Sequence, residues 1–408
     1  MEYDQYKKTI CDYIVRNIAS LKRGANDRNT KLIELTNIIN SQPHKMRFWT
    51  DREVRIESLL ENEDLLKDSS HCFAYDLYPK INNYEIDIAR FEVILLVRKH
   101  WWPGERATRL HEVGPRISRA FAIGGIRCTT LFYEDYSLLS DILDYVKLIN
   151  LSKEKSIVMV DFDCDPIMTP DKRGPWFIQG LRDNFQYVVL FFLDYWRTRR
   201  QSRLLNLSTS LSDAIWIPST SPHTDDPTNT FYFPLPLGLT PVEYNLIRSS
   251  QVMSKGAATY GSIEETNFPR AFWLEALSDI NSYNFYPSWD QEFADPHSDY
   301  ISYLLRLRSD AAVVNFSERD GGSFVATGRA IEAIAIGVPL IQEIFEGYSR
   351  YFFRPDLHYS MFSSIEDLRT LLDQEFNLPR AQFAMNLYDN LYSETAFCRH
   401  FIRFLCSR

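Results

Sequence analysis

The chain has 408 residues, of which 45% are hydrophobic and 24% charged, and its formal net charge is −9. This composition is typical of a globular protein in water, and the length predicts two domains rather than one core. The negative charge argues against general nucleic-acid binding, and the absence of an apolar leader or of ~18 uninterrupted apolar residues predicts a cytoplasmic protein without a membrane span.

The first part of the chain changes character near residue 86. Residues 1–85 are charged and helical in pattern, and we expect them to pack on the first domain. Apolar runs then alternate with amphipathic helices over residues 86–240. The predicted strands are FEVILLV, IRCTTLFY, SIVMVDFD, QYVVLFFLD and DAIWIPS. Because continuously apolar strands are covered on both faces, this region predicts a Rossmann-like domain around a parallel sheet.

The same rhythm restarts after a segment rich in Pro, Thr and Asp. Residues 220–243 form this segment, which predicts a linker. Strands are then expected at 257–262, 311–317 and 338–343, and helices at 269–280, 298–308 and 363–376. Residues 241–385 are expected to form a second Rossmann-like domain, and the helical residues 386–408 to cross back to the first. The predicted fold is α/β, with two domains facing across a cleft and a ligand at the carboxyl ends of both sheets.

The segment GGSFVATGRAIEAIAIGVPLIQE, residues 321–343, carries the clearest chemical pattern. It follows the apolar strand AAVVNFS, and the loop after such a strand faces the ligand crevice of an open α/β sheet. Gly321 and Gly322 permit the close approach of a phosphate. The helix begins near Thr327 or Gly328, where its free N–H groups and its dipole favour an anion.

Two charged residues follow in this helix, Arg329 and Glu332, one turn apart on one face. An arginine in a first turn is unfavourable for the helix dipole, which indicates a negatively charged partner. Arg329 can fork onto a diphosphate, and Glu332 can accept hydrogen bonds from two ribose hydroxyls. With Arg319 and Ser323 of the glycine loop, they predict a nucleotide diphosphate site. The alternative is a surface ion pair worth ~0.5 kcal/mol or less.

The same segment resembles the donor-side signature of the GT-B glycosyltransferases, in which Glu-Ala-x-Ala-x-Gly-x-Pro spans the helix and strand that bind the nucleotide sugar. The matching residues are Glu332, Ala333, Ala335, Gly337 and Pro339. The preceding Gly-Arg and the downstream HYSMFSSIEDL, residues 358–368, resemble the subgroup whose donor segment reads Gly-Arg-x-x-Glu-Ala. The resemblance covers roughly residues 250–380 and implies a GT-B fold and glycosyl transfer.

Three further residues are donor-site candidates. Tyr260 ends the first strand of the second domain, and Glu343 follows the strand VPLIQ, so both are expected at the cleft. The resemblance implies that His358 lies where the family meets the nucleotide, with structural packing as the alternative. Phe324 stands where many retaining members carry an additional glutamate, so the resemblance does not extend to a paired-glutamate mechanism or to the anomeric outcome.

Candidates for the general base come from the first domain, which in this family holds the acceptor. RKHWWPGERATRLHEVGPR, residues 98–116, follows the first strand and contains His100 and His111. Imidazole titrates near neutral pH, which suits a base, although either histidine could instead pack or cap a loop. Asp163, in VDFDCD, is a weaker candidate.

The aspartates of VDFDCD also suggest a second chemistry. Asp161, Asp163 and Asp165 follow a strand, where a GT-A enzyme would hold a divalent ion. The two-domain pattern and the donor-side motif favour GT-B, which normally needs no bound metal. We therefore expect no metal and no cofactor other than the nucleotide-sugar substrate.

The sequence thus predicts a glycosyltransferase that moves a sugar from a nucleotide sugar to a hydroxyl acceptor. From the resemblance alone, the expected acceptor is a glycan or a lipid-linked molecule of bacterial surface polysaccharide or glycoconjugate synthesis. A lipid-linked acceptor would bring the protein to a membrane surface. Two alternatives stay open. One is a nucleotide-sugar epimerase on the same scaffold, and the other is a non-catalytic partner protein that has kept the fold.

Overall fold

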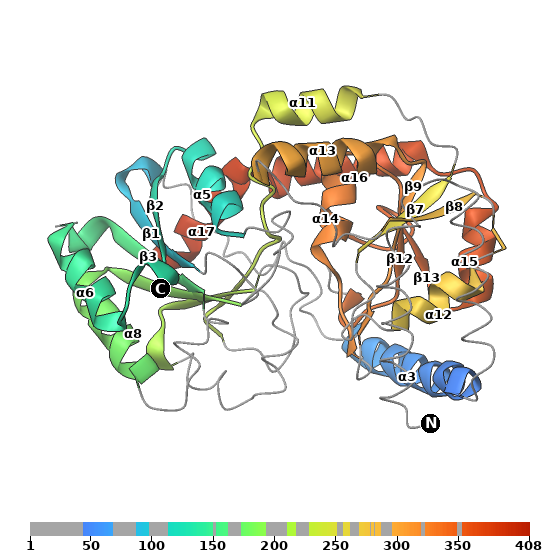
Figure 1. Ribbon diagram of the computed structural model, residues 1–408, viewed down its shortest axis with the longest axis horizontal. Helices are drawn as coiled ribbons and strands as arrows, with labels where there is room; N and C mark the ends of the chain where they lie inside the picture. The colour runs from blue at the N-terminus through green and yellow to red at the C-terminus, as the bar shows by residue number, and fades with distance from the viewer. Residues whose placement is uncertain are drawn as a thin grey trace.

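The computed structural model describes two α/β domains that lie side by side (Figure 1). The described residues are 44–67, 87–97, 113–149, 152–161, 173–192, 210–217, 228–250, 256–261, 269–277, 279–280, 282–286, 296–319, 323–348 and 353–408. The predicted α/β class with two parallel sheets is confirmed. Within the described part of the chain, no helix combines the length and hydrophobicity needed to cross a bilayer.

The first domain is built on a parallel sheet of six strands in the order β2-β1-β3-β4-β5-β6. The strands are β1 (Glu92–Val97), β2 (Arg127–Phe132), β3 (Ser156–Asp161), β4 (Tyr187–Phe191), β5 (Ala214–Ile217) and β6 (Thr230–Tyr232). Its helices are α5 (Val113–Ile123), α6 (Leu139–Leu148) and α8 (Arg173–Asn184), with short 3-10 turns at Ile88–Arg90, Tyr133–Asp135 and Lys153–Lys155. The apolar residues of the central strands are almost fully buried because helices cover both faces.

The second domain has a five-stranded parallel sheet in the order β13-β12-β9-β7-β8. These strands are β7 (Ala257–Tyr260), β8 (Tyr283–Tyr286), β9 (Ala312–Asn315), β12 (Leu340–Glu343) and β13 (Ser360–Phe362). A small antiparallel hairpin, β10 (Glu318–Arg319) and β11 (Ser323–Phe324), follows β9. The helices are α11 (Pro241–Ser249), α12 (Pro269–Ala276), α13 (Pro296–Ser309), α14 (Gly328–Ala335), α15 (Ile365–Leu372) and α16 (Leu378–Leu391).

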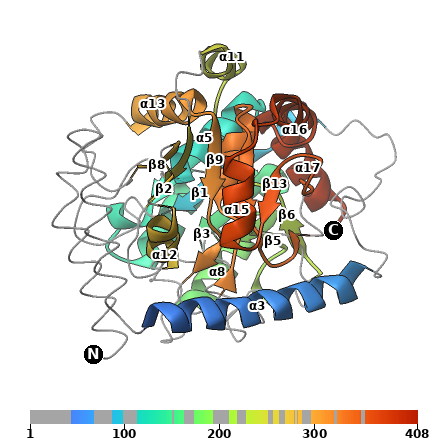
Figure 2. The same ribbon diagram turned by 90° about the vertical axis from the view of Figure 1, so that its right-hand side faces the viewer.

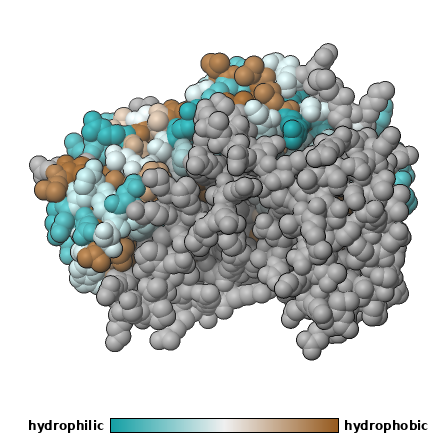
Figure 3. Space-filling model, in the orientation of Figure 1, coloured by the Kyte–Doolittle hydropathy of each residue, from teal (hydrophilic) through white to brown (hydrophobic). Residues whose placement is uncertain are grey.

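Two segments differ from their predicted structure. Residues 220–243, predicted as a linker, contain β6, which pairs with β5, and the start of α11. The polar composition of this segment hid the strand, because β6 has only three residues, TFY, all of which are buried. The structure also contains β8, which pairs with β7 and is not among the strands expected for the second domain. On α11 itself, Val242 and Leu246 are exposed, and hydrophobic atoms gather over this helix at the top of Figure 3.

The N-terminal helix also lies elsewhere than expected. Within residues 1–85 the structure describes α3 (His44–Lys67), which was expected to pack on the first domain. It instead runs along the second domain (Figure 2), and its Arg52 hydrogen-bonds Glu343 at the end of β12. The physical reason is charge: its arginines meet buried carboxylates of that domain.

The last helix, α17 (Glu394–Cys406), returns to the first domain and packs on α5. Phe397 and Phe401 are fully buried, and their rings lie 5.4 and 5.7 Å from the ring of Phe121. Phe397 also lies 5.0 Å from the ring of Trp216 on β5. The core of the first domain is therefore completed by the end of the chain.

Both sheets share one topology, which fixes where a ligand can bind. Counted along the chain, the first five strands of each sheet lie in the order second, first, third, fourth, fifth, and the first sheet adds β6 as its sixth strand. The connections leave in opposite directions along the sheet from the parallel neighbours β1 and β3 in the first sheet, and from β7 and β9 in the second. In open α/β sheets, ligands bind at the carboxyl ends of the strands at such a switch point.

The docking of α17 predicts a large effect of a single truncation. Phe397→Ala should lower the free energy of unfolding by about 3–5 kcal/mol, because a fully buried ring leaves a cavity in the core. Chemical denaturation measures this. Phe383→Ala on α16 is the matched control, since Phe383 is 50% exposed. Equal losses in the two variants would contradict the docking of α17 in the first core.

Candidate functional site

The carboxyl end of β7 carries an arginine pair around a glycine. Gly261 directly follows β7 and has a φ of 131°, a conformation that other residues rarely adopt. A Cβ atom at this position would lie 2.5 Å from Nη1 of Arg270 and 3.0 Å from Nη1 of Arg329. Two guanidinium groups from α12 and α14 therefore meet over one glycine, at the switch point of the second sheet.

Arg329 reaches this point from the first turn of α14, as the sequence pattern predicts. Its side chain is partly exposed, and its Nε is buried without a hydrogen-bond partner among the described residues. Thr327 is the N-cap residue of α14, but its hydroxyl donates to Oδ1 of Asn315 at 2.8 Å and makes no cap hydrogen bond. The helix start is thus tied to the end of β9.

Glu332 is buried, and the structure surrounds it with donors. Its Oε1 accepts from the Tyr300 hydroxyl at 3.0 Å, and its Oε2 accepts from the Tyr303 hydroxyl at 2.9 Å. Arg116, on α5 of the first domain, lies 3.4 Å from Oε1. Burial, together with the nearby carboxylate, raises the pKa of both tyrosines, so their hydroxyls stay protonated and donate. Glu332 therefore links α14 to the first domain.

Tyr260 has its hydroxyl engaged inside the second domain. This hydroxyl donates to Oδ2 of Asp310, which lies between α13 and β9. Burial and the Asp310 carboxylate raise the pKa of Tyr260. The ring packs 5.0 Å from that of Tyr286 and 5.6 Å from that of Tyr303. Tyr260 is therefore held inside the second domain, directly before Gly261 in the chain.

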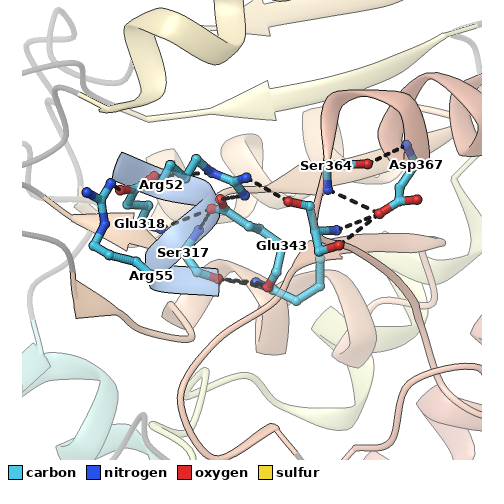
Figure 4. A network of polar contacts seen from close by, with 9 residues as sticks. Arg52, Arg55, Ser317, Glu318, Glu343, Ser364 and Asp367 are labelled. Atoms are coloured by element: carbon cyan, nitrogen blue, oxygen red, sulfur yellow. Dashed lines mark hydrogen bonds and ion pairs between the residues drawn. The ribbon is translucent and has the colours of Figure 1, made fainter. Parts of the chain in front are cut away.

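Glu343 is fully buried at the end of β12 (Figure 4). Its Oε2 accepts from the backbone N–H groups of Ser317, at 2.6 Å, and Glu318, at 3.0 Å. Its Oε1 accepts from Arg52 of α3 at 2.8 Å. The carboxylate expected at the cleft thus organises the turn that leads from β9 to the glycine loop.

His358 is buried beside the aromatic rings of Phe353 and Phe383. Its Nδ1 accepts from the backbone N–H of Arg354 at 2.8 Å. Burial, followed by the nearby Arg354 charge, lowers the pKa of the imidazole to about 4. This is the environment of a neutral packing histidine.

The remaining sequence candidates lie wholly or partly outside the described residues. His100, His111, Asp163 and Gly322 are not described, and of Arg319 and Ser323 only the backbone is. The segments with His100, His111 and Asp163 nevertheless follow β1 and β3, the two strands at the switch point of the first sheet. Among the described residues, no group of three or more His, Cys, Asp and Glu side chains is placed to hold a metal ion.

Sequence reasoning did not single out Arg270, Arg116 or Tyr303. Arg270 belongs to PRAFWLEA, which has the pattern of an ordinary core helix. Its place in the first turn of the helix that follows β7 nevertheless indicated a position near the ligand-binding edge of the sheet. Arg116 and Tyr303 come from other elements and reach Glu332 only through the tertiary fold.

Comparisons with known proteins show likeness only at the level of structure. No protein-family model matches the sequence, and no curated protein matches it. The similar solved structures include AviGT4, a glycosyltransferase involved in avilamycin A biosynthesis, with 12% identity over 78% of this chain and 99% of that chain and a TM-score of 0.48. A trehalose-6-phosphate structure from E. coli with bound UDP-2-fluoro glucose has 9% identity over 77% and 98% of the two chains and a TM-score of 0.45.

TarM is a third similar structure, with 11% identity over 65% of this chain and 58% of that chain and a TM-score of 0.42. All three TM-scores lie below 0.5, so these similarities do not themselves indicate a function.

The neutral state of His358 predicts a pH effect on stability. Between pH 6.5 and pH 4 the unfolded chain binds a proton at this histidine, whereas the folded chain does not, so stability falls as pH falls through this window. His358→Asn keeps an acceptor for the Arg354 N–H and removes this titration. From pH 7 to pH 5, wild type should lose about 1 kcal/mol more unfolding free energy than the variant, a value reduced for solvent screening.

Denaturation at the two pH values measures this difference. His400, whose pKa burial also lowers to about 4, is present in both proteins and cancels. An imidazole of residue 358 that titrates near pH 6.5 by NMR would contradict the prediction.

Proposed function

We propose that this protein is a glycosyltransferase of the GT-B type, which holds a nucleotide-sugar donor in its second domain and transfers the sugar to a hydroxyl acceptor held by the first. The observation that carries the proposal is the meeting of Arg270 and Arg329 over Gly261 at the switch point of the second sheet. Two positive groups placed at a glycine suit a ligand with two adjacent negative charges, which a nucleoside diphosphate has.

The donor would be held by charge and by the helix start together. Arg329 would fork onto one phosphate, and Arg270 would neutralise the second. The N-terminus of α14, with Arg319, Gly322, Ser323 and Thr327 in the preceding segment, would supply further donors. Gly261 lets both guanidinium groups approach the backbone closely, because a Cβ atom there would lie 2.5 Å from Nη1 of Arg270 and 3.0 Å from Nη1 of Arg329.

Glu332 is 1% exposed and its two oxygens already accept from Tyr300 and Tyr303, so it is proposed to position α14 rather than to contact the ribose, the role expected from the sequence. Its contact with Arg116 ties α14 to α5, so a nucleotide bound at this helix would also influence how the two domains meet. Closure of the domains around the donor would exclude water and limit its hydrolysis.

The acceptor would approach from the first domain. His111, His100 or Asp163 is proposed as the base, because the segments that carry them follow the strands at the switch point of the first sheet. A base there would take the proton from the acceptor hydroxyl as its oxygen attacks the sugar carbon, and the nucleoside diphosphate would leave. A glycan or a lipid-linked acceptor of surface polysaccharide synthesis remains the proposed class.

A non-catalytic role is the second candidate, and one observation favours it. Phe324, at the position where many family members carry a glutamate, is 2% exposed and belongs to the hydrophobic core. A protein of this kind would bind the nucleotide without transferring the sugar.

The arginine pair predicts how binding responds to mutation. Arg329→Gln should weaken the affinity for a nucleoside diphosphate by about 10- to 100-fold, the factor expected for one lost charge-assisted contact. Isothermal titration against UDP, GDP and ADP measures this, and the same variant should keep its melting temperature. Arg369→Gln is the matched control, because Arg369 makes a bidentate pair with Asp279 on the surface of the same domain.

Incubation with the sugar conjugate of the nucleotide that binds then separates the candidates. Released nucleoside diphosphate supports transfer, an altered sugar stereocentre without release indicates an epimerase, and binding without turnover indicates the non-catalytic protein. Failure of wild type to bind any of the three diphosphates, or equal affinity in Arg329→Gln, would overturn the proposal.

A further inference from the structure

A single buried arginine of α3 connects three strand ends of the second sheet. Arg52 is 2% exposed. Its Nη1 donates to the Ser363 carbonyl after β13 at 2.7 Å, its Nη2 donates to Glu343 Oε1 at the end of β12 at 2.8 Å, and its Nε lies 3.3 Å from Glu318 Oε2 after β9. These are the carboxyl ends of three of the five strands, the edge at which a ligand binds.

Aromatic packing and a second arginine hold α3 in the same place. The Arg52 guanidinium lies 4.6 Å from the ring centre of Trp273, and the Trp49 ring meets Trp273 edge-on at 5.2 Å. Arg55 lies about one helical turn after Arg52 on α3 and forms an ion pair with Glu318 (Figure 4). The helix is therefore docked through defined contacts of several kinds.

From Glu343 the polar contacts continue into the proposed donor site. Glu343 accepts from the N–H groups of Ser317 and Glu318, which lead into the glycine loop. The Gln342 amide nitrogen donates to the Ser317 hydroxyl at 2.6 Å, and its amide oxygen accepts from Asn315 at 2.7 Å. Asn315 in turn accepts from Thr327, the N-cap residue of α14. Hydrogen bonds thus run without a gap from α3 to the helix that carries Arg329.

Two carboxylates make Arg52 necessary for this arrangement. Glu318 and Glu343 are both buried and lie close enough for the charge of Glu343 to raise the pKa of Glu318. Burial is the larger cause, and the pKa of Glu318 reaches about 7 even with Arg52 and Arg55 beside it. Without the Arg52 charge, the two carboxylates would repel each other, and Glu343 would lose the partner that orients it.

We propose that Arg52 is a positioning residue for the donor site: by holding Glu343, it fixes the backbone after β9 and the start of α14 in the shape that receives the diphosphate. This inference rests on the proposed function for the identity of the ligand. It assigns to Arg52, a 2% exposed residue of α3, control over the affinity of the site.

The test compares wild type with Arg52→Gln, Arg52→Lys and the matched control Arg369→Gln. Amide hydrogen exchange of the ligand-free proteins reports the loop directly, because the Ser317 and Glu318 amides are bonded to Glu343. In Arg52→Gln these two amides should exchange about tenfold faster or more, the factor expected for a lost charge-assisted hydrogen bond. Arg369→Gln should match wild type.

Titration with the nucleoside diphosphate that wild type binds gives the second readout. Arg52→Gln should bind about tenfold more weakly or worse, and Arg52→Lys should lie between, because an ammonium keeps the charge but cannot reach three acceptors as a planar fork does. Unchanged amide exchange in Arg52→Gln would overturn the inference. Faster exchange with unchanged binding would also overturn it, and so would faster exchange with tighter binding, which would indicate that α3 blocks the site. If wild type binds no diphosphate, the proposed function fails, while the exchange data still decide whether Arg52 holds the loop.

Discussion

The pairing of buried arginines with buried carboxylates determines how the parts of this protein are joined. A buried charge without a partner costs several kcal/mol, so each such pair restricts the elements that carry it. Arg52 and Arg55 with Glu318 and Glu343 join α3 to the second sheet, and Arg116 with Glu332 joins α5 of the first domain to α14. Arg116 therefore contacts the proposed donor helix α14 directly, whereas Arg52 is connected to it through the hydrogen bonds that begin at Glu343.

Much of the fold was predictable because it depends on local patterns. Buried parallel strands such as EVILLV and SIVMVD are continuously apolar, and the helices between them have apolar faces, so the α/β alternation is visible in the sequence. The short strand β6 was missed because three buried residues carry too little pattern among prolines and threonines. The position of α3 was also missed, since it depends on Arg52 meeting carboxylates 266 and 291 residues further along the chain.

The candidate site was predictable only where it follows from position after a strand. Arg329 was identified from its place behind the glycine loop, and the structure brings it to the end of β7. Arg270 was overlooked because PRAFWLEA has the pattern of an ordinary core helix, although its place after β7 pointed to the site. Glu332 and Glu343 were identified as important carboxylates, but their partners Arg116 and Arg52 come from distant elements that no local periodicity connects to them.

The return of α17 to the first domain has a consequence for biosynthesis. Phe397 and Phe401 complete a core whose strands have all been translated by residue 232, before the second domain has begun. On the ribosome, the nascent first domain must therefore wait with an open apolar surface until residues 394–406 emerge. Contacts of such long sequence separation slow folding, so this exposed half-formed core is where a chaperone would bind the growing polypeptide.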